Sequence, residues 1–131
     1  MRKLAILFIL LVSTVMFSSP SYAEWTKVSS SRGGANIFYV DFERIRKHGG
    51  YVYFWYLLDL LKPFKGALSS KLYAQGDCKL FRFKNLSSSL HKEPMGGGTG
   101  EIHNPKNPEW DYPPPNSPIE TILKKSVVGE L

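Results

Sequence analysis

The chain has 131 residues, 43% of them hydrophobic and 14% aromatic, and a formal net charge of +6 at pH 7. This length supports one domain around one hydrophobic core and excludes a protein of several domains. The mildly basic charge suits a soluble domain, and it also suits contact with an anionic surface such as lipid headgroups, polysaccharide or an acidic protein patch. Nucleic acid is not expected as a partner, because the N-terminus carries an export pattern.

The first 23 residues follow the three-part pattern of a secretory signal peptide. Met1-Arg2-Lys3 is a basic tip, Leu4–Val12 is apolar, and Ser21 and Ala23 are small residues at positions −3 and −1 of a cleavage site. Cleavage between Ala23 and Glu24 leaves a single domain of residues 24–131, which has 108 residues and a net charge of +4. The later apolar runs are shorter than the roughly 20 residues of a membrane span, so no transmembrane segment is expected after cleavage.

The mature chain is predicted to begin with a β-hairpin. Glu24–Ser29 suggests a first strand, Ser30–Gly34 a turn, and Asn36–Phe42 a second strand rich in β-forming residues. Asp41–Lys47 then changes in character, because an acid stands at its start and three basic residues stand near its end. This charge order suits the dipole of a short helix, so we expect one or two helical turns with Asp41 as the cap.

The longest apolar run of the mature chain is Tyr51–Leu58, within Gly50–Leu61, and five of its eight residues are aromatic. Aromatic and β-branched residues favour a pleated strand over a helix. Alternation makes both faces of this strand apolar. We therefore predict a central strand with one face packed on a helix and the other face covered in a second way, for example by a second subunit. An aromatic platform that stacks on a ligand is the alternative.

Two more strands are predicted after a turn at Pro63–Gly66, namely Leu68–Ala74 and Cys78–Phe83. In the second of them, lysine and arginine are interleaved with apolar residues, as in an edge strand or a face open to water. The same interleaving could offer a basic and aromatic binding face. The candidate partner-binding residues are Lys79, Arg82 and Lys84.

Residues 85–115 have little regular pattern. Asn85–Pro94 is polar and serine-rich, and we assign no strand to it. Met95–Gly100 is a flexible glycine loop, and it is not a phosphate loop because it lacks the Gly-Lys-Ser/Thr ending. Glu101–Pro115 contains five prolines, which exclude a regular ladder. We expect this extended segment to be pinned to the domain by Trp110 and Tyr112.

A helix start is the sharpest local signal in the chain. Ser117 is placed as the N-cap, Pro118 as the first helical residue, and Glu120 as the acid of a capping box. The apolar stripe of this helix is formed by Ile119, Ile122 and Leu123. We expect the helix to lie on one face of the sheet, with the stripe against the central strand.

The residues indicate no catalytic site. The three histidines, His48, His91 and His103, are each more than ten residues from the next and have no metal-binding spacing. Cys78, the only cysteine, lies beside Asp77, whose charge would raise the thiol pKa. We expect a buried, inert thiol at Cys78, with pairing to another molecule as the alternative. No enzyme activity, metal or cofactor is predicted.

Several of these features together resemble the surface-adhesin protein E family of Gram-negative bacteria, over nearly the whole mature chain. They are Trp25, Phe38-Tyr39-Val40-Asp41 followed by Ile45, a strand that contains Trp55, Ser69-Ser70, Asp77-Cys78, Met95-Gly96 with Gly98, Trp110, and Pro115-Asn116-Ser117 before the last helix. The resemblance implies a small α+β domain, an antiparallel sheet with the C-terminal helix packed on one face. It also implies export and, as in the founding adhesin of the family, binding to host extracellular-matrix and serum proteins, with a homodimer as one assembly.

The chain departs from this family in two ways. Family members often carry a second cysteine near the C-terminus that can pair with the one matching Cys78, whereas this chain has Lys125-Ser126-Val127-Val128 there. The founding adhesin is a lipoprotein, whereas no cysteine follows the apolar N-terminal segment here. Both locations therefore stay open, the periplasm and the cell surface of a Gram-negative bacterium.

Two hypotheses of function follow. The first is a non-catalytic binding protein that engages a host or envelope macromolecule through Lys79, Arg82 and Lys84. The second is a periplasmic accessory protein or carrier of a small ligand, which would need a pocket between helix and sheet.

Overall fold

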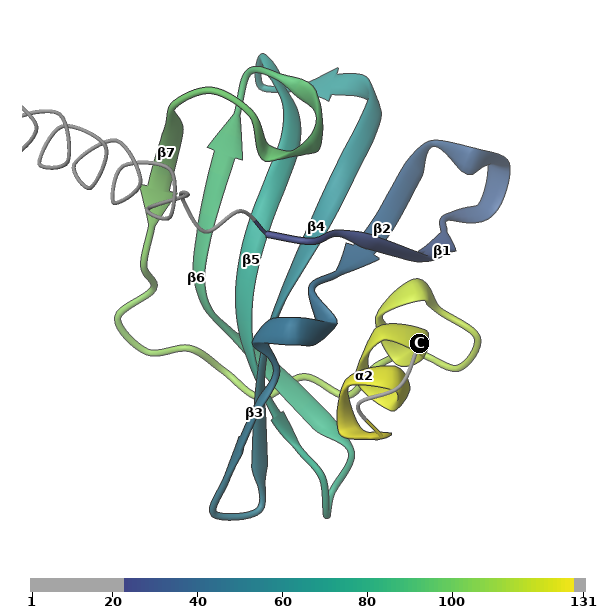
Figure 1. Cartoon of the computed structure of the whole chain (residues 1–131), viewed down its shortest axis with the longest axis vertical. Coiled ribbons are helices and arrows are strands. Elements are labelled where there is room, and N and C mark those ends of the chain that lie inside the picture. Colours follow the sequence, from purple (N-terminus) through teal and green to yellow (C-terminus); the bar gives the residue numbers. More distant parts are fainter. Residues whose placement is uncertain (1–22, 129–131) are drawn as a thin grey trace, which may run out of the picture.

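The computed structural model describes residues 23–128, apart from the side chain of residue 32; the predicted signal peptide lies outside the described residues up to residue 22. The domain is a seven-stranded antiparallel sheet with helix α2 packed against it (Figure 1). The strand order is β1-β2-β4-β5-β6-β7, and β3 pairs with β4. The strands are β1 (Thr26–Ser30), β2 (Asn36–Val40), β3 (Arg46–His48), β4 (Tyr51–Phe64), β5 (Ala67–Asp77), β6 (Arg82–His91) and β7 (Gly100–His103).

The predicted central strand is confirmed as β4, which pairs with β2, β3 and β5. It is longer than predicted and runs through Pro63, where the register with β5 is irregular and a proline costs no ladder hydrogen bond. The turn that follows shrinks to Lys65 and Gly66, with φ of 49° and 77°. Two positive φ values are what a two-residue hairpin turn of type I′ requires.

Helix α2 (Pro118–Val128) begins where the sequence predicts. The backbone N–H of Glu120 donates to Ser117 Oγ at 3.2 Å, which is the predicted cap. The Glu120 carboxylate accepts from the N–H of Asn116 at 3.3 Å, one residue before the partner of a standard capping box. The helix therefore starts from sequence-local contacts, and its position on the sheet then depends on packing.

The core lies between this helix and one face of the sheet. Alternate residues of β4 are buried against it, and the side chains of Ile122 and Leu123 face them from the helix. Gly76 of β5 lies under the helix: a Cβ atom there would be 2.7 Å from Leu123 Cδ1 and 2.8 Å from Val52 Cγ1. Only glycine allows the helix to approach β5 this closely.

The helix covers only part of this face. At about 3.3 Å per residue the 14 residues of β4 span roughly 46 Å, whereas the 11 residues of α2 span about 16 Å. Helix α2 contacts β1, β2 and β4, and both α2 and β1 lie in front of the sheet in Figure 1. The far end of the β4–β5 hairpin extends beyond the helix.

The predicted helical turns at Asp41–Lys47 are only partly present. One 3-10 turn, η2 (Phe42–Arg44), is capped by Asp41, whose Oδ1 accepts from the N–H of Glu43 at 3.2 Å. The remaining residues form β3, which pairs with the start of β4. Pairing is possible because Gly49 and Gly50 take positive φ values and form a tight hairpin. Tertiary pairing overrides the helical charge order here.

The strand predicted at Cys78–Phe83 is wrong. The strand β5 continues to Asp77, residues 78–81 form a turn, and β6 begins at Arg82 and takes in most of the serine-rich segment. The turn forms because Asp77 Oδ1 accepts from the N–H groups of Lys79 and Leu80 at 3.0 and 3.1 Å. Cys78 lies on this turn and is exposed, contrary to the expectation of a buried thiol.

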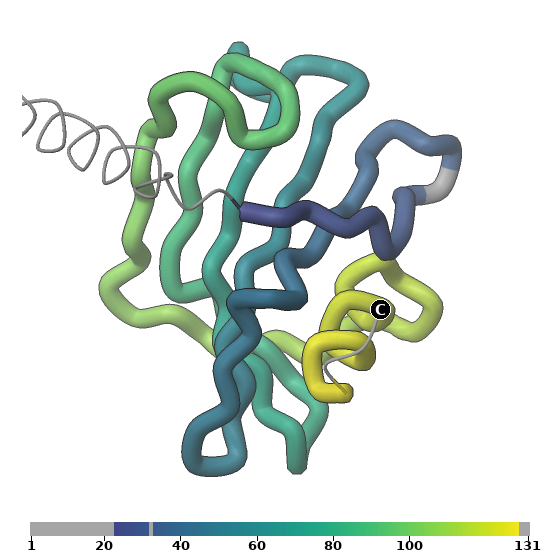
Figure 2. Tube along the Cα trace, viewed as in Figure 1, coloured from purple at the N-terminus to yellow at the C-terminus, as the bar shows by residue number. Residues whose placement is uncertain are grey.

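The connections between the long strands gather at the two opposite ends of the sheet. The β3–β4 and β5–β6 turns lie together at one end (Figure 2), where the N–H of Cys78 donates to the carbonyl of Gly50 at 3.3 Å. At the other end, the glycine loop folds over Leu57: Ser69 Oγ donates to the carbonyl of Glu93 at 2.6 Å and accepts from the N–H of Gly96 at 2.8 Å. These bonds satisfy the hydroxyl group of Ser69, which is fully buried near the start of β5.

We expect Gly76→Ala to lower the free energy of unfolding by about 1–3 kcal/mol, because the added methyl group overlaps Leu123 and Val52. The measurement is urea unfolding followed by circular dichroism. The double variant Gly76→Ala/Leu123→Ala should lose less than the sum of the two single variants, because Leu123→Ala removes the overlapping Cδ1 atom. A Gly76→Ala protein as stable as the wild type would contradict this packing.

Candidate functional site

The face of the sheet opposite the helix carries a row of aromatic side chains. Tyr51, Tyr53 and Trp55 alternate along β4, and Tyr73 lies across from Trp55 on β5. The ring of Tyr73 lies 4.8 Å from that of Trp55 and 6.3 Å from that of Tyr53. All four side chains are half-buried. We call these residues, together with Trp110, the aromatic face; its partial exposure means that the second cover expected from the sequence is incomplete within the described chain.

Trp110 completes this face from a distant part of the sequence. The N–H of Asp111 donates to the carbonyl of Phe83 at 2.7 Å, and the N–H of Phe83 donates back at 2.9 Å. This bridge holds the proline-rich segment against β6 and places the indole ring 5.9 Å from the ring of Tyr51. The prediction that Trp110 pins the segment is confirmed. Tyr112, predicted to do the same, is 65% exposed.

Two basic side chains lie over the indole ring. Arg82 Cζ is 4.3 Å and Lys84 Nζ is 4.4 Å from the centre of the Trp110 ring. At these distances the negative face of the ring attracts both cations. The register pairs these residues with Asp77 and Gln75 of β5, so both project on the aromatic face. The result is a basic and aromatic cluster at the end of the sheet where the β5–β6 turn lies.

Asp77 fixes the position of Arg82. Its Oδ2 accepts from Arg82 Nε at 3.0 Å, while its Oδ1 caps the turn. The backbone N–H of Leu80, together with Arg82 and the N–H of Lys79, lowers the pKa of the Asp77 carboxyl below its usual value, although burial opposes this. An ionised carboxylate is therefore built into the turn, and it neutralises part of the charge of Arg82.

The three residues predicted to bind a partner are only partly brought together. Arg82 and Lys84 converge on Trp110, whereas Lys79 lies on the exposed turn and contributes its backbone N–H to Asp77. The sequence did not reveal that Trp110 joins the two cations. The signal that could have suggested it is a tryptophan in a proline-rich segment. Only the start of that segment forms a strand, β7, which pairs with β6 although the prolines were expected to exclude a ladder.

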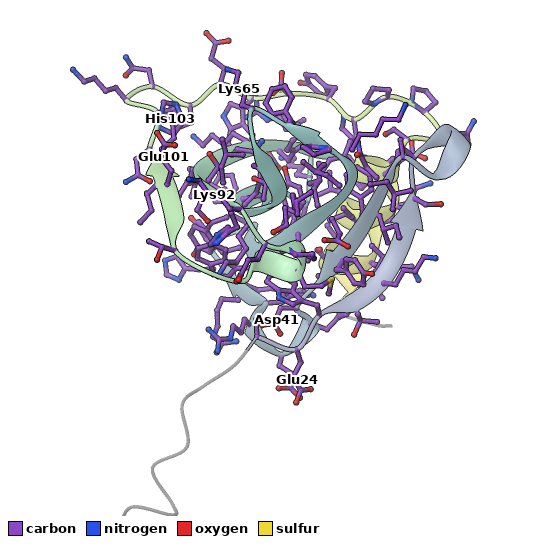
Figure 3. The ribbon with its side chains drawn as sticks, turned by 90° about the horizontal axis from the view of Figure 1, so that it is seen from above. Glu24, Asp41, Lys65, Lys92, Glu101 and His103 are labelled. Atoms are coloured by element: carbon purple, nitrogen blue, oxygen red, sulfur yellow. The ribbon has the colours of Figure 1, made fainter. Side chains whose placement is uncertain are left out.

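The histidines are not brought together. His91 is buried and its Nε2 lies 2.7 Å from Ser89 Oγ, which gives it a structural partner. His103 lies on β7 at the outer edge of the molecule, next to Glu101 (Figure 3), and His48 lies on β3. Among residues 23–128, no three His, Cys, Asp or Glu side chains are grouped so that they could hold a metal ion.

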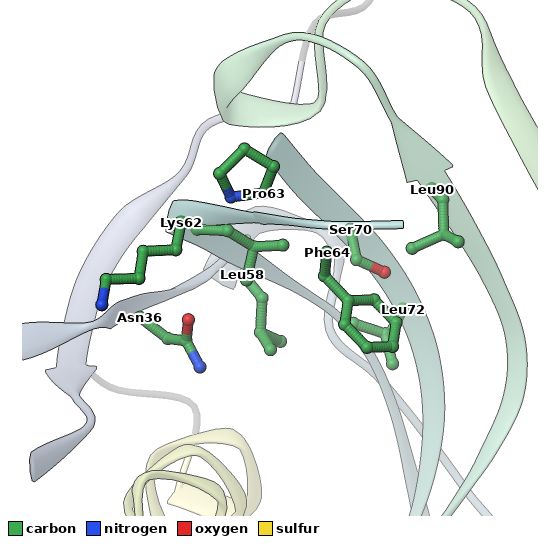
Figure 4. A pocket seen from close by; sticks show the side chains of 9 residues that line it. Asn36, Leu58, Lys62, Pro63, Phe64, Ser70, Leu72 and Leu90 are labelled. Carbon is green, nitrogen blue, oxygen red and sulfur yellow. The ribbon is translucent and has the colours of Figure 1, made fainter. Parts of the chain in front are cut away.

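A second candidate site lies on the helix-bearing face, beyond the end of α2. It is a groove with a cavity volume of about 430 Å³ at the far end of the β4–β5 hairpin (Figure 4). Most of its lining is apolar, and no residue of α2 contributes to it. The groove is lined by Asn36, Leu58, Leu60, Lys62, Pro63, Phe64, Ser70, Leu72 and Leu90. Its volume falls in the range of small-ligand sites, which are about 300–1,000 Å³.

These features define a small α+β domain, built on one curled antiparallel sheet with a terminal helix. The chain belongs to the surface-adhesin protein E family, whose model matches residues 25–126. This family indicates a bacterial surface or exported protein. No helix in residues 23–128 is long and apolar enough to cross a membrane.

Solved structures support the same fold. The crystal structure of protein E from non-typeable Haemophilus influenzae matches with a TM-score of 0.61 at 14% identity, over 83% of this chain and 80% of that chain. Crystal form II of Haemophilus influenzae protein E also gives 0.61, at 15% identity, over 83% of this chain and 91% of that chain. At such low identity the likeness concerns the fold alone. Among curated protein sequences, none matches this chain significantly.

We expect Asp77→Asn to unfold at a lower temperature than the wild type at neutral pH. The pKa of Asp77 is lower in the folded protein than the usual 3.8, so its carboxylate stabilises the fold above pH 3.8. This stabilisation is lost as the pH falls through the folded pKa, and the difference in Tm should therefore narrow in acid.

The measurement is thermal unfolding by circular dichroism from about pH 7 to about pH 2, across the range in which carboxylates titrate. Glu101→Gln, which removes an exposed carboxylate on β7, is the control and should show no comparable narrowing. If the Tm of the wild type exceeded that of Asp77→Asn by the same amount down to the lowest pH, the ionised carboxylate would not have the proposed role.

Proposed function

We propose that this protein is an exported, non-catalytic binding protein that engages a macromolecule through the aromatic face and its basic residues. The observation that carries the proposal is the placement of Arg82 and Lys84 over the half-exposed ring of Trp110. Tryptophan, tyrosine and arginine are the residues that dominate protein–protein binding energies. The membership of the chain in a family of surface adhesins supports the same class of function.

The chemistry of this face favours an acidic protein surface as the partner. Arg82 keeps guanidinium N–H groups beyond the one bonded to Asp77, and Lys84 supplies a point charge beside it. Lys79 on the adjacent exposed turn adds a third positive charge at the rim. Rim charges chiefly speed association and set the salt dependence, whereas the rings supply the apolar contact. A homodimer that buries part of this face would be a second use of the same surface.

A carrier of a small ligand is the second candidate function. The specific observation in its favour is the apolar groove of about 430 Å³ beyond the end of α2. The sequence-based hypothesis placed such a pocket between helix and sheet, and the groove lies on that face without contact to the helix. The two functions use opposite faces of the sheet, so variants can separate them.

We expect Lys79→Glu/Lys84→Glu to weaken binding to the partner at least tenfold, about 1.4 kcal/mol, because two attractive charges become repulsive. Arg82 stays unchanged in this variant because it also holds Asp77. The measurement is surface plasmon resonance on the mature protein, against immobilised extracellular-matrix and serum proteins, at low and high salt. Trp110→Leu should also weaken binding, with less dependence on salt.

The matched control is Lys92→Glu/Lys106→Glu, which changes the net charge equally at two exposed lysines that are not among the residues of the aromatic face. Circular dichroism confirms that each variant folds. If both double variants weaken binding equally, overall charge and not this face is responsible. If neither Lys79→Glu/Lys84→Glu nor Trp110→Leu weakens an interaction seen with the wild type, the aromatic face is not the binding site.

The location of the protein decides which macromolecules it can meet. We expect protease treatment of intact cells to digest the mature protein if it is displayed on the surface, as in an adhesin. Protection in whole cells, with release by osmotic shock, would place it in the periplasm and would exclude host proteins as partners. A periplasmic protein of known location, probed in the same samples, controls for leakage.

A further inference from the structure

The apolar groove exists because the sheet is longer than the helix that covers it. Leu58 and Leu72 belong to the row of core residues on β4 and β5, and they pack against the edge of the core. Beyond them, Leu90 of β6 and Phe64 at the tip of β4 continue the apolar surface (Figure 4). Phe64 is 56% exposed. Helix α2 does not extend over this apolar surface, which is therefore accessible to water.

One end of the groove is polar. The side chains of Lys62 and Asn36 line it, and Figure 4 shows both on the side away from Leu90. In the part of the chain that the structure describes, neither the Lys62 ammonium nor the Asn36 side-chain amide has a hydrogen-bond or ion-pair partner. An unpaired cation and an amide donor at one end of an apolar groove are complementary to a carboxylate that carries an alkyl chain.

We propose that this groove binds a long-chain carboxylate, that is, a fatty acid. The alkyl chain lies along Leu58, Leu72 and Leu90 under the ring of Phe64, and the carboxylate meets Lys62 and Asn36. A neutral lipid would leave Lys62 without a counterion, and a small polar anion would leave the apolar walls exposed. This inference rests on the second candidate function, the carrier of a small ligand. It is independent of the aromatic face, so a groove that binds no fatty acid would leave the proposed macromolecule binding unaffected, and the reverse also holds.

The chain length of the ligand tests the apolar part of the site. Burial of one methylene strengthens binding roughly threefold to fourfold. The mature protein should therefore bind decanoate, dodecanoate and tetradecanoate with rising affinity in isothermal titration calorimetry, below the concentrations at which these soaps form micelles. Phe64→Ser, at an exposed position, should weaken all three. Absence of binding throughout the series would overturn the proposal.

The charge of the ligand tests the polar end. Lys62→Glu should weaken dodecanoate at least tenfold and leave dodecanol unchanged, whereas Lys106→Glu, an equal charge change elsewhere, should leave both unchanged. Equal binding of dodecanol and dodecanoate, unaffected by Lys62→Glu, would overturn the assignment to a carboxylate. The wild-type protein could instead bind no dodecanoate and form a concentration-dependent dimer in sedimentation velocity. If Phe64→Ser abolished that dimer, a second copy of the chain and not a fatty acid would cover the groove.

Discussion

The structure depends on one constraint, the apolar character of both faces of β4. A strand of this kind must be covered twice, because each face presents aromatic or aliphatic side chains to whatever lies above it. Helix α2 and β1 cover one face, and there Val52 and Phe54 are fully buried. The other face receives no second helix within the described residues, only a tryptophan and a glycine loop. The exposed surfaces of the molecule follow from this unequal cover.

Trp110 and the glycine loop each cover part of this second face. They lie at its opposite ends and are held in place in different ways. The glycine loop is closely fitted: a Cβ at Gly96 would be 3.2 Å from Leu57 Cδ1, and the N–H of Met95 donates to Asp59 Oδ1 at 2.9 Å. Trp110, in contrast, rests on Tyr51 and is attached mainly through the Phe83–Asp111 bridge. The glycine loop completes the burial of Leu57, whereas Trp110 leaves the neighbouring aromatic rings partly exposed to solvent. The rings near Trp110 are therefore the more accessible part of this face.

The sequence predicted the parts of the fold that depend on local signals. The composition of the aromatic run predicted β4, and Ser117 with Glu120 predicted the helix start because these two residues contact each other. It placed the start of β6 too early, at Cys78, because Gly76 and Asp77 are residue types typical of turns, whereas pairing with β4 keeps both of them in β5. It also missed that the serine-rich segment is a strand, since pairing with β5 and β7 outweighs its polar composition. The contact of Trp110 with two cations joins distant segments and has no local signature.

Asp77 connects the stability of the fold to the chemistry of the aromatic face. The same carboxylate caps the β5–β6 turn and holds Arg82 Nε, so the guanidinium is positioned over Trp110 before any partner arrives. A positioned side chain loses less conformational freedom on binding than a mobile one, which lowers the cost of association. Within residues 23–128, Lys84 forms no ion pair, and it reaches the same ring as a more flexible charge. The cluster thus combines one rigid, directional donor with one adaptable cation. A guanidinium of fixed orientation can pair with a planar carboxylate through two N–H groups, and the proposed acidic protein partner would supply such a carboxylate.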